Sequence, residues 1–86
     1  MAPEQINQDI EVILYTGEKG QLHLARFRWR DMVFKNDRTI NVNKQGAVYF
    51  YTVQCHSGDI AQIELDFNRR KWTLISMQAA PPGAFH

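Results

Sequence analysis

The segment 25–30, with the sequence Ala-Arg-Phe-Arg-Trp-Arg, alternates apolar and cationic side chains without interruption. Alternate side chains of an extended strand point to opposite faces, so this alternation predicts a strand with one buried face and one charged face. The apolar members, which share the first face, are Ala25, Phe27 and Trp29. The cationic members, which share the second face, are Arg26, Arg28 and Arg30.

The same two-residue period recurs along the chain between clusters of Gly, Asn, Asp and Ser, which favour turns. We expect strands at residues 10–15, 22–30, 33–35, 39–42, 47–55, 60–67 and 72–78. The last three form an antiparallel meander. Apolar residues nowhere follow the i, i+3, i+4, i+7 spacing of an amphipathic helix over about 10–12 residues, so helix is expected to be scarce.

A chain of 86 residues is expected to form one domain, residues 1–86, with an ordered core of about 9–78 and an extended or mobile tail at 79–86. An open flat sheet would leave too many aromatic side chains in water. We therefore predict a mainly β fold, a small antiparallel meander closed into an SH3-like roll or barrel. The expected core residues are Phe27, Trp29, Val53, Leu65, Trp72 and Leu74.

The formal net charge is only +1, so long-range attraction to nucleic acid or anionic membranes is expected to be weak. Cys55 is the single cysteine, which excludes an intrachain disulfide. The first nine residues lack the pattern of a secretory signal, and no run approaches the roughly 18 apolar residues of a membrane span. These features predict a cytoplasmic protein without membrane contact.

Several short motifs together resemble a small bacterial β-domain family of unknown function. The motifs are Asp9-Ile10-Glu11-Val12, Arg26-Phe27-Arg28-Trp29-Arg30, Tyr51-Thr52-Val53, Glu64-Leu65-Asp66 and the closing Trp72-Thr73-Leu74. The resemblance covers most of residues 9–77 and implies a common architecture. Asp31-Met32 replaces the Gly-Arg turn of that family, and residues 36–46 lack its tryptophan-rich connection. The resemblance implies no activity.

Two groups of cations are candidates for contact with an anion or a nucleic acid. They are the three strand arginines Arg26, Arg28 and Arg30 and the turn residues Arg69, Arg70 and Lys71. Guanidinium groups suit phosphate oxygens, and nearby aromatic rings would offer stacking surfaces for unpaired bases. The alternative is a solvated strand face whose arginines pair with carboxylates such as Glu11, Glu64 and Asp66.

Catalytic, cofactor and metal sites are not expected. Cys55 and His56 are neighbours on one strand and point to opposite faces, so they do not form a metal-ligand pair. Glu64 and Asp66 share a strand face, but a domain this small rarely supplies the cleft that acid–base catalysis needs.

The remaining classes of function are binding functions. We predict an uncharacterised, non-catalytic module for protein interaction or self-association that uses an exposed strand edge and surface tyrosines, with Tyr49 and Tyr51 as the candidate interface. The partner would be a second copy or another protein. The alternative is a small β-barrel that binds nucleic acid through its arginine-rich strand face.

Overall fold

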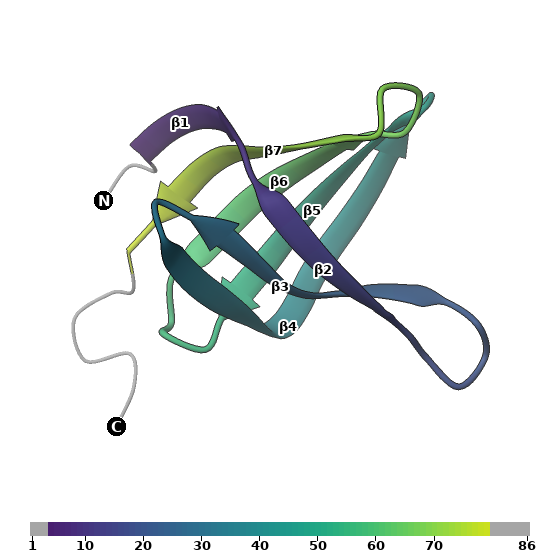
Figure 1. Ribbon diagram of the computed structural model, residues 1–86, viewed down its shortest axis with the longest axis horizontal. Coiled ribbons are helices and arrows are strands. Elements are labelled where there is room, and N and C mark those ends of the chain that lie inside the picture. The colour runs from purple at the N-terminus through teal and green to yellow at the C-terminus, as the bar shows by residue number, and fades with distance from the viewer. Residues whose placement is uncertain (1–3, 80–86) are drawn as a thin grey trace.

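The computed structural model describes residues 4–79, which form seven β-strands joined by short turns (Figure 1). The strands are β1 (Glu4–Asp9), β2 (Glu11–Thr16), β3 (Leu22–Trp29), β4 (Met32–Gln45), β5 (Val48–Cys55), β6 (Ile60–Asp66) and β7 (Lys71–Gln78). All neighbouring strands are antiparallel, and the described residues contain no helix. The predicted mainly β class is confirmed.

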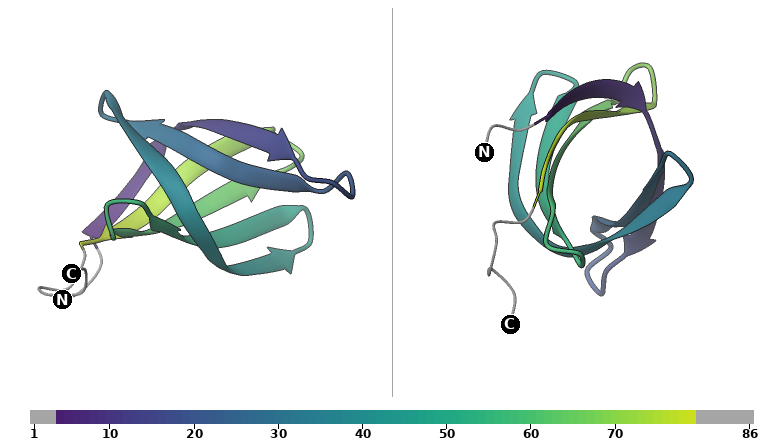
Figure 2. Two further views of the ribbon diagram at one scale, coloured as in Figure 1. Left: turned by 90° about the horizontal axis from the view of Figure 1, so that it is seen from below. Right: turned by 90° about the vertical axis from the view of Figure 1, so that its left-hand side faces the viewer.

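Strands β2 to β7 form a meander in which each strand pairs with the next, and β1 then pairs with β7. The strand order is therefore β1-β7-β6-β5-β4-β3-β2. Only Ile10 separates β1 from β2 in the chain, although these strands lie at opposite ends of that order. The sheet must curl until its ends approach each other, as Figure 2 shows, and the Ile10 amide donates a hydrogen bond to the Trp72 carbonyl at 3.2 Å.

The long strand β4 turns the sheet by changing its partner. Residues 32–35 pair with β3, and residues 36–45 pair with β5. The ladder to β5 contains two extra residues, Asp37 and Ile40, and such bulges increase the local twist. At the change of partner, the Asn36 side-chain amide donates to the Leu24 carbonyl at 2.8 Å in place of a backbone partner. The expected separate strands at 33–35 and 39–42 are thus one strand, because the bulges accommodate residues 36–38 without ending it.

The core consists of side chains that point into the curl. The buried apolar residues are Leu24, Phe27, Phe34, Val53, Cys55, Ala61, Ile63 and Leu74. Three of the six expected core residues are fully buried. The other three, Trp29, Leu65 and Trp72, are only half-buried. For Trp29 the reason is chemical, since its indole Nε1 donates to the Gln8 side chain at 2.8 Å and therefore stays at the rim of the core.

A bulge at Ala25 sets which side chains of β3 face the core. Ile13 pairs with Arg26 but Leu14 pairs with Leu24, so β3 contains one residue more than β2 at this point. The extra residue reverses the alternation, and both Leu24 and Phe27 are buried although they are three positions apart. The expected uninterrupted alternation is correct from residue 26 to residue 29 and fails at Ala25.

Strand β1 begins before residue 9, the position at which the core is expected to start. Residues 4–9 form β1, whose register places Glu4 opposite Met77 and Asp9 opposite Thr73. Asn7 has a φ of 52°, a left-handed conformation that goes with the bulge in this strand. Apart from Ala79, the expected C-terminal tail lies outside the described residues. Within residues 4–79 there is no helix long and apolar enough to cross a membrane.

Candidate functional site

The second half of β4 forms an exposed edge of the sheet. On the β3 side, the pairing of β4 ends at Lys35, and within residues 4–79 no other strand takes up this side beyond that point. Every side chain from Asp37 to Gln45 is exposed, including Ile40 at 47% and Val42 at 48%. Unpaired N–H and C=O groups along such an edge are a template for another strand. We call residues 37–45 the β4 edge.

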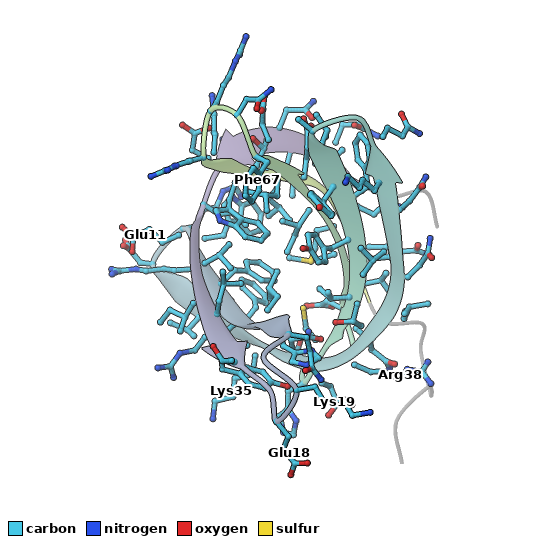
Figure 3. The ribbon with its side chains drawn as sticks, turned by 90° about the vertical axis from the view of Figure 1, so that its right-hand side faces the viewer. Glu11, Glu18, Lys19, Lys35, Arg38 and Phe67 are labelled. Carbon is cyan, nitrogen blue, oxygen red and sulfur yellow. The ribbon has the colours of Figure 1, made fainter. Side chains whose placement is uncertain are left out.

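The inner face next to the β4 edge is aromatic. Tyr49 and Tyr51, the candidate interface residues, are half-buried on β5, and their rings lie 6.4 Å apart. Phe67, which is 63% exposed, lies 6.4 Å from the Tyr49 ring, and Trp72 lies 5.6 Å from the Tyr51 ring. Phe67 lies in the turn between β6 and β7, at the rim of the curled sheet in Figure 3. Burial raises the pKa of Tyr51, and the neighbouring Tyr49 adds to the shift.

The strand arginines lie on the opposite, outer surface of the β2–β3–β4 layer. Arg26 and Arg28 are both exposed there, in line with the sequence alternation. Arg30 is not on the strand, because Arg30 and Asp31 have φ values of 52° and 60° and form the tight turn between β3 and β4. The Arg30 guanidinium carbon lies 4.4 Å from the centre of the Trp29 ring, a cation–π contact.

A further cation joins the two strand arginines. Lys35 is the direct cross-strand partner of Arg26, while Val33 is the partner of Arg28. On the other side, β2 places Ile13 beside Arg26 and Glu11 beside Arg28. Glu11 and Lys35 point away from the core in Figure 3. A groove on this surface is lined by Glu11, Ile13, Arg26, Phe27, Arg28 and Val33.

Few of these cations are neutralised within the described part of the chain. Arg28 forms an ion pair with Asp31 at 3.2 Å, in which both side chains are largely exposed. Among residues 4–79, no carboxylate lies within 4.0 Å of the charged nitrogens of Arg26 or Lys35. The expected alternative partners Glu64 and Asp66 lie on β6, which is separated from β3 by β4 and β5.

The basic turn 69–71 does not extend the arginine surface continuously. Arg69 lies 3.7 Å from Asp66, and Lys71 lies 3.3 Å from Asp9. Arg70 lines a separate apolar hollow with Leu14, Leu65, Phe67 and Trp72. Exposed ion pairs such as these contribute about 0–1 kcal/mol each, but they reduce the charge available to an anion.

Cys55 and His56 are the candidate reactive side chains among residues 4–79, and the structure places them in different environments. Cys55 is buried, and burial together with the nearby Asp59 raises the pKa of its thiol to about 11. His56 is exposed in the adjacent turn. Within the described residues, no three His, Cys, Asp or Glu side chains come together as a metal site requires.

Sequence reasoning missed two features of these surfaces, the β4 edge and the placement of Lys35. The edge was missed because residues 36–38 were read as a break between strands. Lys35 was missed because its position opposite Arg26 depends on the two-residue turn at Arg30 and Asp31. The sequence indicated a tight turn one residue later, at Asp31-Met32.

Comparisons with other proteins add nothing to this geometry. No family model matches the chain, and no curated protein or solved structure is detectably similar to it. The resemblance noted in the sequence therefore carries no functional argument.

Proposed function

We propose that the protein is a non-catalytic interaction module that self-associates by pairing strands along the β4 edge. The observation that carries this proposal is the exposed backbone of Asp37–Gln45, which has a sheet partner on one side only. Strand addition to a free edge uses main-chain hydrogen bonds for affinity and alternate side chains for specificity. It requires neither a deep pocket nor reactive groups.

Pairing is best supported for residues 41–45. The bulges at Asp37 and Ile40 disturb the first half of the edge, and natural sheets use such bulges to block pairing. From Asn41 to Gln45 the register with β5 is regular. A twofold axis at Asn43 would place Asn41 opposite Gln45 of a second copy and Val42 opposite Lys44. In this register no two like charges lie opposite each other between residues 41 and 45 of the two copies. The side-chain amides of Asn41, Asn43 and Gln45 can both donate and accept hydrogen bonds across the interface.

A second strand at this edge would also cover apolar surface on the inner face. Val42 is the cross-strand partner of Tyr51, and Lys44 that of Tyr49. The Lys44 ammonium lies 5.4 Å from the centre of the Tyr49 ring, a cation–π contact at the edge of this face. Side chains of the added strand would pack beside Val42 and continue the inner face. Burial of this apolar surface would favour association.

Sedimentation velocity over about 5–500 μM protein tests the proposal. The expected result is a monomer–dimer equilibrium, with concentration-dependent protection of amides 41–45 from hydrogen exchange. Asn43→Lys places like charges opposite each other at the axis and should weaken dimerisation about 5-fold or more. Gln62→Lys adds the same charge to the outer face of β6 and should have no effect. A monomer at every concentration would refute self-association.

A further inference from the structure

Arg26 and Lys35 are like charges placed directly opposite each other on adjacent strands. Such a pair is unfavourable unless an anion lies close by. Both side chains are exposed, and within residues 4–79 neither forms an ion pair. Glu11 is the nearest carboxylate by register, but it lies opposite Arg28. The surface thus contains two cations whose charge is available to an external ligand.

An exposed aromatic stack continues this surface along the β2–β3 hairpin. Glu11, Ile13 and Tyr15 alternate on one face of β2, and Tyr15 is 54% exposed. The Tyr15 ring stacks on the His23 ring, with centroids 5.0 Å apart and planes inclined by 25°. The Tyr15–His23 pair lies beyond the Ala25 bulge from the Ile13–Arg26 pair, so the stack continues the outer face of the hairpin past Arg26. The outer face therefore carries one aromatic stack at the hairpin end of its row of cations.

We propose that this outer face of β2, β3 and β4 binds single-stranded nucleic acid. Arg26 and Lys35 contact backbone phosphates, and Tyr15 stacks on an unpaired base. Arg28 contributes less, because Asp31 already shares its charge at 3.2 Å. The proposal is independent of dimerisation, since the face belongs to β2, β3 and residues 32–35, whereas the β4 edge begins at Asp37.

The chemistry of the face favours a single strand over a duplex. A flat aromatic ring stacks on bases only where they are unpaired, and such stacking tolerates any sequence. A duplex in the same position would present only its phosphates, to which two or three cations give weak attachment. Glu11 works against a general polyanion surface, because it repels phosphate at one position of the row and restricts where the strand can lie.

The test is fluorescence anisotropy with a labelled oligothymidylate of about 12 nucleotides, at about 50 mM and 200 mM salt. Two or three phosphate contacts on a single strand give a slope of about −1.4 to −2.1 in log affinity against log salt. Affinity should therefore fall about 7- to 20-fold over this range. Arg26→Gln with Lys35→Gln should remove about 1.4 from the slope. The matched control Arg69→Gln with Arg70→Gln removes two exposed cations from the basic turn, which lies outside both this face and the β4 edge, and should leave the slope unchanged.

A second variant tests the stacking step. Tyr15→Leu keeps an apolar side chain on the hairpin and should weaken binding about 5- to 100-fold without changing the salt slope. Duplex DNA of the same length should compete poorly. Absence of binding at about 50 mM salt would overturn the proposal. Three other results would also overturn it: equal effects of the two double variants, competition by heparin as strong as that by unlabelled oligothymidylate, or unchanged binding after Tyr15→Leu. Each of these would indicate general electrostatic attraction without a specific binding site.

Discussion

Replacing Leu74 by alanine tests the packing of the curled sheet most directly. Leu74 is 0% exposed, and β7 lies between β1 and β6, with Gln8 and Ile63 as the cross-strand partners of Leu74. Neighbours held by ladders on both sides cannot collapse fully into the space left by the lost side chain. Large-to-small changes of this kind lower the free energy of unfolding by about 2–5 kcal/mol. We expect about 3 kcal/mol for Leu74→Ala.

That loss is a large part of the total stability. A domain of 86 residues is expected to be stable by about 4–13 kcal/mol. With a urea dependence of about 1 kcal/mol per molar, the unfolding midpoint of Leu74→Ala should fall by about 3 M. The fluorescence of Trp29 and Trp72 reports the transition, because both rings are half-buried and become fully hydrated on unfolding.

Phe67→Ala is the matched control for this measurement. Phe67 is a larger apolar residue but is 63% exposed, so its truncation should change the free energy of unfolding by about 0.5 kcal/mol or less. A loss below about 1 kcal/mol for Leu74→Ala, or equal losses for the two variants, would refute the placement of Leu74 in a closely packed core. It would mean that the side of β7 assigned to the interior is hydrated.

Three further outcomes follow from particular contacts. The pKa of the Cys55 thiol is raised from its ordinary value of 9.0 to about 11 in the folded protein. Between pH 9 and pH 11 the unfolded state therefore loses the thiol proton while the folded state keeps it, so the urea midpoint should fall as the pH rises. The fall should be smaller in Cys55→Ala. Asn36→Ala removes the 2.8 Å hydrogen bond to the Leu24 carbonyl and should lower the free energy of unfolding, measured by urea titration, by about 1 kcal/mol. Asn36→Asp, whose carboxylate cannot donate this hydrogen bond, should be destabilised at least as much. Gly46 has a φ of 61°, and a Cβ added there would meet no neighbouring atom. Gly46→Ala should therefore lower the free energy of unfolding, measured by calorimetry, by about 1 kcal/mol through backbone strain alone.

The elements with uninterrupted two-residue alternation were predictable from the sequence. Strands β5 and β6 lie within two residues of their expected limits, because Tyr49, Tyr51 and Val53 alternate with outward-facing side chains along β5. β1 was not predictable in this way. Residues 4–9 contain a single strong β-former, Ile6, among polar residues, and the strand exists because β7 offers an unpaired edge beside it. Tertiary pairing, rather than local preference, determines this strand.

Bulges explain most of the remaining differences, since a single extra residue exchanges the two faces of a strand. The sequence places Arg26 and Arg28 correctly on an outer face because the alternation is regular from residue 26 to residue 29. It does not show that Lys35 lies opposite Arg26, because that relation depends on the two-residue turn as well as on both strands. The pairing of Lys35 with Arg26, which most distinguishes this surface, therefore depends on strand register. Register is determined by the pairing of all the strands in the sheet, so it cannot be predicted from a local sequence pattern.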